Sequence, residues 1–185
     1  MKGLETDLEL VERASTGDRL AFESLVARYQ GPVYNAALRV TGNPADAHDV
    51  AQTVFLKVVE HLHEYDRQRK FFSWIFRIAV NEAINLVQRR RPEDPLDDDD
   101  DAGHDAGDGS RPDWRYGQHQ IADRIQQALM TLRTDDRIVL TLRHFSECSY
   151  QEMAQILSLE VKTVKSRLYE ARQRLGDMLL DLKVR

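Results

Sequence analysis

The sequence has a single cysteine, Cys148, among its 185 residues. One thiol excludes an internal disulfide framework and a four-cysteine zinc site. No apolar run approaches the ~20 residues that a membrane-spanning helix needs, and the first residues lack the apolar stretch of a secretory signal. Because 42% of the residues are hydrophobic and 31% are charged, we expect a globular protein of the cytoplasm that does not insert into membranes.

Motifs of common enzyme and metal classes are missing as well. The chain has no glycine-rich phosphate loop, no G-x-S-x-G and no H-E-x-x-H. His61 and His63 are two residues apart, so they do not share a helix face. His144 and Cys148 are four apart, but a helix break is expected between them, and zinc sites use three or four ligands. We expect no enzyme activity, no metal or other cofactor, and no small-molecule substrate.

Charge is distributed unevenly along the chain. Residues 92–113 contain ten acidic residues and one basic residue, whereas residues 1–91 carry a net charge of +1 and residues 114–185 a net charge of +3. The acidic strip has one large apolar residue, Leu96, and is bracketed by Pro92 and Pro112. It cannot bury enough apolar surface to offset the entropy of ordering, so it predicts a flexible linker at 92–113 between domains at 1–91 and 114–185.

Helical signals dominate both flanking blocks, and no stretch outside the strip alternates as a strand does. Gly42 predicts the end of one helix, Asn43 the cap of the next, and Pro44 its first turn. We expect helices near 5–16, 19–40, 44–64, 71–91, 114–132, 135–145, 149–157 and 161–181. The predicted fold class is all-α, with two small helical domains joined by an acidic flexible linker, the C-terminal one a helix-turn-helix.

The predicted helix 71–91 has two distinct faces. Apolar residues recur at helical spacing on the inward face, at Phe72, Phe76, Ala79, Val80, Ala83 and Val87. The other face carries an aromatic ring, amides and a cation, at Trp74, Arg77, Asn81, Asn85 and Gln88, before Arg89, Arg90 and Arg91. Amides can hydrogen-bond base edges, tryptophan can stack on a base and arginine can pair with phosphate. Periodicity alone favours the alternative, a solvated face with a half-buried tryptophan.

Residues 149–157, a joint at 158–161 and the helix at 161–181 have the layout of a helix-turn-helix. The inward stripe of the longer helix is Val161, Val164, Leu168, Ala171 and Leu175. Its outward residues are Lys162, Lys165, Ser166, Tyr169, Arg172 and Gln173, flanked by Arg167 and Arg174. An ordinary helical hairpin with a basic face is the alternative. The charge bias favours a helix that lies in the major groove of DNA.

Together these segments resemble a bacterial sigma factor of the extracytoplasmic-function group, over nearly the whole chain. Residues 21–29, 45–57 and 72–85 are similar to the family's promoter −10 domain, and the last of these strings is the most specific. Residues 142–154 and 161–172 are similar to its −35 domain. The resemblance implies a factor that joins core RNA polymerase, directs it to a promoter and helps to melt the DNA.

The resemblance also implies roles for particular residues. In the segment 46–57, Asp49, Gln52 and Phe55 would contact the polymerase clamp, whereas Thr53 departs from the acid that often follows the glutamine. The −10 contacts would come from Lys70, Trp74, Arg77, Asn81, Asn85 and Arg89, with a base flipped into a pocket near the loop at 65–70. The −35 contacts would come from Lys162, Thr163, Lys165, Ser166, Arg167 and Tyr169. Glu170 and Glu147 depart from positions that are frequently basic and glycine, respectively.

The expected partners are core RNA polymerase, promoter DNA and an anti-sigma factor. Two other interpretations are compatible with the residues themselves: an autonomous helix-turn-helix regulator whose first domain dimerises, and an interaction adaptor that never touches DNA. The acidic strip has two interpretations of its own, a nucleic-acid mimic in the polymerase cleft or a solubilising tether.

Overall fold

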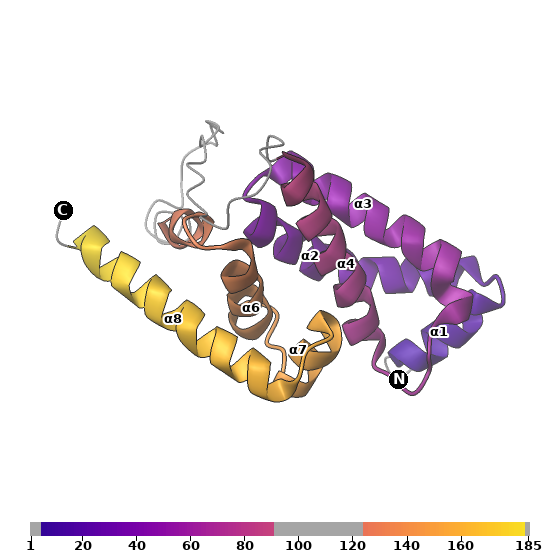
Figure 1. Ribbon diagram of the computed structural model, residues 1–185. Helices are drawn as coiled ribbons and strands as arrows, with labels where there is room; N and C mark the ends of the chain where they lie inside the picture. Colours follow the sequence, from indigo (N-terminus) through magenta and orange to yellow (C-terminus); the bar gives the residue numbers. More distant parts are fainter. Residues whose placement is uncertain (1–4, 91–123, 184–185) are drawn as a thin grey trace.

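The computed structural model describes residues 5–90 and 124–183, and every regular element within these ranges is a helix (Figure 1). The predicted all-α fold is therefore confirmed. The linker predicted at 92–113, and residues 114–123 of the helix predicted after it, lie outside the described residues.

The first part of the chain forms four packed helices, which we call the N-terminal unit. They are α1 (Asp7–Ser15), α2 (Arg19–Thr41), α3 (Pro44–His61) and α4 (Phe71–Arg90), with a short 3₁₀ turn at Leu62–Glu64 after α3. The predicted helices match these bounds to within a few residues. The longest difference is at the end of α3, where the predicted helix continues through what is a 3₁₀ turn.

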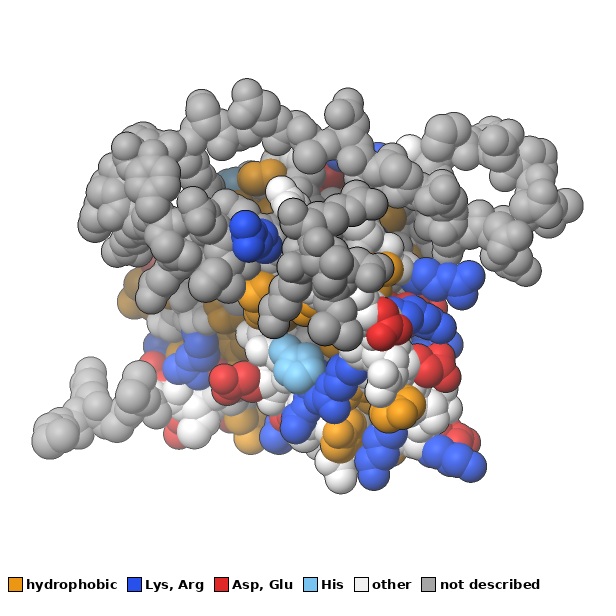
Figure 2. Space-filling view, turned by 90° about the vertical axis from the view of Figure 1, so that its left-hand side faces the viewer, with side chains coloured by type: hydrophobic (Ala, Val, Ile, Leu, Met, Phe, Trp, Pro, Cys, Tyr) orange, Lys and Arg blue, Asp and Glu red, His pale blue; other side chains and the backbone are white. Residues whose placement is uncertain are grey.

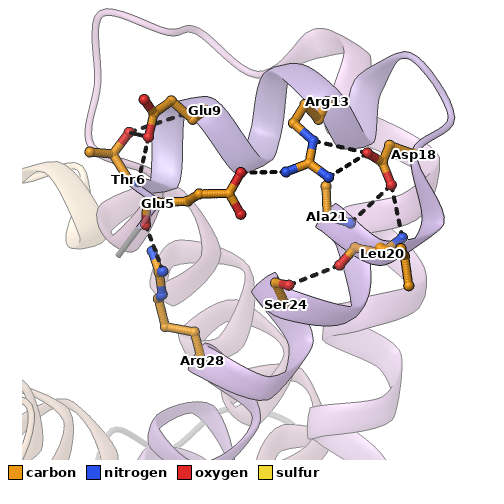
Figure 3. Close-up of polar contacts among 9 residues, drawn as sticks. All are labelled: Glu5, Thr6, Glu9, Arg13, Asp18, Leu20, Ala21, Ser24 and Arg28. Carbon is orange, nitrogen blue, oxygen red and sulfur yellow. Dashed lines mark hydrogen bonds and ion pairs between the residues drawn. The ribbon is translucent and has the colours of Figure 1, made fainter. Parts of the chain in front are cut away.

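Local capping chemistry sets the ends of these helices. Thr6 and Glu9 form a reciprocal capping box at the start of α1 (Figure 3), and Asp18 accepts hydrogen bonds from the first turn of α2. Gly42 closes α2 in the left-handed conformation with φ 72°, and the side chain of Asn43 accepts hydrogen bonds from the first turn of α3. The predicted helix stop and start at residues 42–44 is confirmed.

Ion pairs fasten α1 to its neighbours. Arg13 lies between two carboxylates, contacting Glu5 on one side and Asp18 at 2.7 Å on the other (Figure 3). Arg28 of α2 contacts Asp7 and donates to the backbone carbonyl of Glu5 at 2.8 Å. Because most of these side chains are substantially exposed, the pairs orient α1 more than they stabilise the unit.

The C-terminal unit consists of a helical stretch at 124–130 followed by α6 (Thr134–His144), α7 (Tyr150–Leu157) and α8 (Val161–Lys183). Ser149 and Glu152 form a capping box at the start of α7. Within residues 124–183, two non-glycine residues have left-handed backbone conformations, Glu147 (φ 53°) before α7 and Ser158 (φ 55°) after it. The turn into α7 therefore adopts a glycine-type conformation at Glu147, where the family often has glycine.

The two units pack against each other along α4 and α2. Figure 1 shows α6 and α7 lying between α8 and the helices of the N-terminal unit. Because α4 is covered by α2 and α3 on one side and by α7 on another, Phe71 and Ile75 are buried together with most of the predicted stripe. The inward face of α4 is therefore wider than the periodicity predicted.

Candidate nucleic-acid and polymerase interfaces

The helix α8 presents the predicted basic face to solvent. Its inward residues Val164, Leu168 and Ala171 are buried against α6 and α7, which confirms the centre of the predicted stripe. The residues predicted to point outward are exposed, at Lys162, Lys165, Ser166, Tyr169, Arg172 and Gln173. Thr163 is half-buried. The arrangement matches a helix able to enter a major groove, with a shorter helix behind it.

Two cationic side chains lie against one aromatic ring where α6, α7 and α8 meet. The ring of Tyr150, the first residue of α7, lies 5.0 Å from the guanidinium carbon of Arg143 and 5.4 Å from the ammonium nitrogen of Lys165. Both distances are within the range of cation–π attraction. Arg143 also donates a hydrogen bond of 2.7 Å to the carbonyl of Cys148, which closes the turn before α7.

Two arginines beside the outward face tie α8 to α6. Arg167 lies 3.4 Å from Asp135, and Arg174 lies 2.5 Å from the buried carboxylate of Asp136. Part of the positive charge counted from the sequence is thus neutralised within the unit. Arg167 is less available for DNA than its neighbours on α8 because it is half-buried as well as paired.

A histidine adjoins the basic face. Arg172 lies 3.2 Å from His144 Nε2. Figure 2 views the side of the molecule that carries α8, where Lys and Arg side chains lie among acidic and hydrophobic ones. Burial, with Arg172 and Arg143 nearby, lowers the pKa of His144 below its usual range. The imidazole is therefore neutral at pH 7 and adds no charge to this face.

The outward face of α4 is also in solvent, at Arg77, Asn81, Asn85 and Arg89. Trp74 differs, because its half-buried ring packs 5.4 Å from the ring of Tyr65 and 5.6 Å from that of Phe71. The tryptophan therefore belongs to an aromatic cluster at the start of α4, directly after the loop at 65–70. One side of that cluster is the place where a base could stack.

Two basic residues near this face have partners elsewhere in the fold. The Lys70 ammonium lies 2.8 Å from the carboxylate of Glu152 in α7. Arg90 contacts the buried carboxylate of Asp46 at the start of α3. Arg90, which the sequence placed in a basic tail, therefore joins the end of α4 to α3.

An apolar groove of about 700 Å³ runs between α2 and α3. Its lining includes Gln52 and Phe55, two of the three residues predicted to contact polymerase, and Asp49 is exposed nearby on the same helix. Leu56 and Val59 also line it and leave 64% and 57% of their surface exposed. Such an apolar surface on a helix pair is typical of a helix-binding site.

The α2 wall of this groove was not among the surfaces predicted from the sequence. That wall includes Phe22, Val26, Gln30 and Tyr34, which recur every four residues along one face of α2. The pattern was available in the sequence, but it could not be distinguished from a core stripe until the position of α3 was known.

The described residues contain no group of three or more His, Cys, Asp or Glu side chains that could hold a metal ion. His144 ends α6 and Cys148 lies beyond the turn, as the expected helix break implied. Cys148 is buried, and burial raises the pKa of its thiol to about 12. Across residues 5–90 and 124–183, no helix is both long and apolar enough to cross a membrane.

Comparison with known proteins covers both units. Residues 25–93 match the family model for sigma-70 region 2, and residues 122–175 match that for sigma-70 region 4. The chain is 35% identical to the RNA polymerase sigma-H factor of Pseudomonas aeruginosa over 96% of each chain. It is 31% identical to the extracytoplasmic-function sigma factor SigW of Bacillus subtilis over 93% of this chain and 96% of that protein.

A solved structure is similar over almost the full length. It is that of CnrH in complex with the cytosolic domain of CnrY, with a TM-score of 0.73 and 28% sequence identity, covering 95% of this chain and 97% of CnrH.

Proposed function

Because the chain belongs to the extracytoplasmic-function group of RNA polymerase sigma factors, we propose a separate role for each of its exposed surfaces. As an alternative sigma factor it binds core RNA polymerase, recognises the −35 and −10 promoter elements and helps to melt the DNA. The single observation that carries the assignment is the exposure of the outward faces of both α4 and α8. We place the two functional domains at residues 1–91 and 114–185.

The −35 element is recognised by α8 in the major groove. Lys162, Lys165, Ser166 and Tyr169 are exposed on one stripe of this helix and supply the contacts, with Thr163 beside them. The ring of Tyr150 lies 5.4 Å from the ammonium nitrogen of Lys165 and restrains it, so fewer side-chain rotamers are lost when the lysine meets DNA. Arg167 contributes to the positive electrostatic potential of this face and makes no base contact, because it is paired with Asp135.

The −10 element is engaged by the start and outward face of α4. Asn81 and Asn85 are exposed amides that can donate to and accept from base edges, and Arg77 and Arg89 lie on the same helix for phosphate contacts. Trp74 belongs to the aromatic cluster where an unstacked base would be received, and Lys70 directly precedes α4 beside that cluster. Extruding that base costs a few kcal/mol, which stacking and hydrogen bonds there offset.

The groove between α2 and α3 receives the polymerase. Phe55 and Gln52 lie in its wall, and Asp49 supplies a charge at its edge. An apolar groove with a polar rim suits a helical partner segment. This surface acts without catalysis: sigma factors are non-catalytic initiation factors, and we assign the chain no enzyme activity, no cofactor and a cytoplasmic location beside its polymerase.

We further propose an anti-sigma factor as a partner. CnrH, the sigma factor whose structure this chain resembles, was solved in complex with the cytosolic domain of CnrY. A partner of this kind would inhibit the present chain by covering the α2–α3 groove or the C-terminal unit. Copurification from the host under non-inducing conditions tests it, and recovery of the chain without any such partner would count against it.

In vitro transcription with purified core polymerase on a promoter library tests the main assignment. The chain should direct initiation from a defined set of sequences only when core polymerase is present. An autonomous helix-turn-helix regulator would instead shift duplex operator DNA by itself, and an adaptor would keep its function after substitution of Lys165. Either result would overturn the assignment.

A further inference from the structure

An acidic side chain stands on the outward face of α8, among the residues assigned to the −35 element. From residue 162 to residue 174 the sequence has five basic residues and one acid, Glu170. Its side chain is 58% exposed. Because an α-helix has about 3.6 residues per turn, Glu170 follows the exposed Ser166 by one turn on the same face. The acid therefore lies within the recognition face, on the side of α8 opposite the buried Leu168.

The carboxylate of Glu170 has a counter-ion whose own position is fixed. The guanidinium of Arg174, one turn further along α8, lies 3.5 Å from Glu170 through Nη2. Through Nη1 the same guanidinium lies 2.5 Å from Asp136 of α6, whose carboxylate is buried. An exposed pair of this kind contributes little to stability. Its effect is geometric, because the buried partner holds the cation that Glu170 faces.

The chemistry of a carboxylate limits the bases that it can contact. A carboxylate offers only acceptor oxygens. In the major groove, the exocyclic amino groups of cytosine and adenine are donors, whereas guanine and thymine present acceptors. Adenine also places its N7 acceptor beside its amino group, and cytosine has no acceptor on its own edge. A glutamate in the major groove therefore favours cytosine.

The position of Glu170 on the helix distinguishes a base contact from simple repulsion of DNA. A carboxylate turned toward the phosphates would weaken binding to every sequence alike, because phosphate charge does not depend on sequence. A carboxylate turned toward the base edges offsets this repulsion at one kind of base pair only. Glu170 shares the outward face of α8 with Ser166 and Lys162, which are exposed. When this face enters the groove, the carboxylate is directed at base edges.

We propose that Glu170 determines part of the −35 specificity by accepting a hydrogen bond from the exocyclic amino group of a cytosine in that element. The inference rests on the proposed function, because it requires α8 to lie in the major groove. The basic residues of α8 attract DNA of any sequence. Glu170 adds discrimination, because it disfavours base pairs that present only acceptors at its position.

Transcription by the holoenzyme from a library randomised across the −35 element measures the preference at each position. The wild-type chain should prefer cytosine at one position by roughly tenfold. Glu170→Ala should reduce that preference to about twofold or less and leave the other positions unchanged. Glu170→Gln should shift it toward adenine, because a glutamine amide pairs with adenine through two hydrogen bonds. Preferences that stay the same in both variants, or that change at all positions alike, would overturn the proposal.

Asp177→Asn is the matched control for the loss of one negative charge. Asp177 is exposed on the same helix, two turns beyond Glu170, and so lies farther from the N-terminal part of α8 that meets the bases. Its loss should strengthen binding to all sequences slightly and shift no base preference. If Asp177→Asn relaxed the cytosine preference as much as Glu170→Ala, the effect would be one of charge and the proposal would be wrong.

A base analogue isolates the single hydrogen bond. The preferred cytosine is replaced by an analogue that lacks the exocyclic amino group, and promoter binding is compared for holoenzymes with the wild-type chain and with Glu170→Ala. The weaker base pair in the DNA is common to both measurements, so the wild-type chain should lose several-fold more affinity than the variant. Equal losses would overturn the role of Glu170 alone. If the wild-type chain directs initiation from no member of the library, the sigma-factor assignment of these surfaces is wrong instead.

Discussion

The ammonium of Lys70 lies 2.8 Å from the carboxylate of Glu152, although the two residues are 82 positions apart. The pair joins the loop before α4 to the first turn of α7. It holds the pKa of Glu152 down to about 2, first through the hydrogen bond from Lys70 and then through those from Ser149. The same carboxylate therefore caps α7 and joins it to the N-terminal unit.

The first prediction follows from this lowered pKa. A carboxyl whose folded pKa lies below its ordinary value of 4.5 stabilises the fold above that value and loses this contribution as pH falls toward 2. The free energy of unfolding should therefore fall as the pH drops from about 4.5 toward 2, measured by urea denaturation at a series of pH values. Glu152→Gln should flatten that part of the profile. An unchanged profile in the variant would show that other carboxyls control the transition.

The second prediction concerns the groove. A side chain added at Gly31 would meet nothing within 4 Å and would enter the groove between α2 and α3. Gly31→Leu should weaken core polymerase binding about tenfold, or ~1.4 kcal/mol, because the added side chain fills part of the groove. The Tm is measured beside the affinity, because a leucine before Pro32 inside α2 is disfavoured in a helix. Gly176→Leu, an equally open helical site on α8, is the control for polymerase affinity. If both variants bind polymerase like the wild type, the groove is not the docking site.

The third prediction separates base contact from charge on α8. Lys165→Ala should cost ~1–3 kcal/mol of promoter-binding free energy and relax specificity for the −35 sequence. Lys162→Ala should instead weaken binding to all DNA sequences alike and reduce the slope of log affinity against log salt by about one. Binding of promoter variants to the holoenzyme at several salt concentrations distinguishes the two. Unchanged −35-dependent transcription with Lys165→Ala would contradict the placement of α8 in the major groove.

The fourth prediction concerns the left-handed residue before α7. Glu147 has φ 53°, a conformation that is unfavourable for a residue with a Cβ atom and free for glycine. Glu147→Gly should stabilise the chain by up to ~1 kcal/mol, which is about 2–4 °C in Tm. Gln151→Gly, an exposed position inside α7, should destabilise by ~1 kcal/mol. Destabilisation by both would mean that Glu147 makes a compensating contact.

The fifth prediction concerns the thiol. Cys148 is 1% exposed, and burial raises its pKa to about 12, so little thiolate exists at pH 8. Alkylation by iodoacetamide should be at least about a hundredfold slower in the native chain than in the chain unfolded in guanidinium. Rapid native alkylation would indicate that the turn before α7 opens readily.

The sequence determined the local elements because their signals are local. Caps at Thr6, Asn43 and Ser149 and the stop at Gly42 place the helix ends to within a few residues. The 3.6-residue period assigned the inward stripe of α8 and the outward amides of α4. Segments of these same two helices carried the family resemblance, so the fold class and the function could both be predicted from the sequence.

Only the tertiary structure decided which helix faces are covered and by what. The burial of Phe71 and Ile75, the α2 wall of the groove and the packing of α6 against α2 and α4 all depend on contacts between residues far apart in the chain. A periodic apolar stripe shows that a face is buried but does not specify its partner, because hydrophobic burial is non-directional. The partners of charged side chains are likewise set by the tertiary structure. Arg90 and Arg167 resemble free basic residues in the sequence, but the fold places Asp46 and Asp135 beside them.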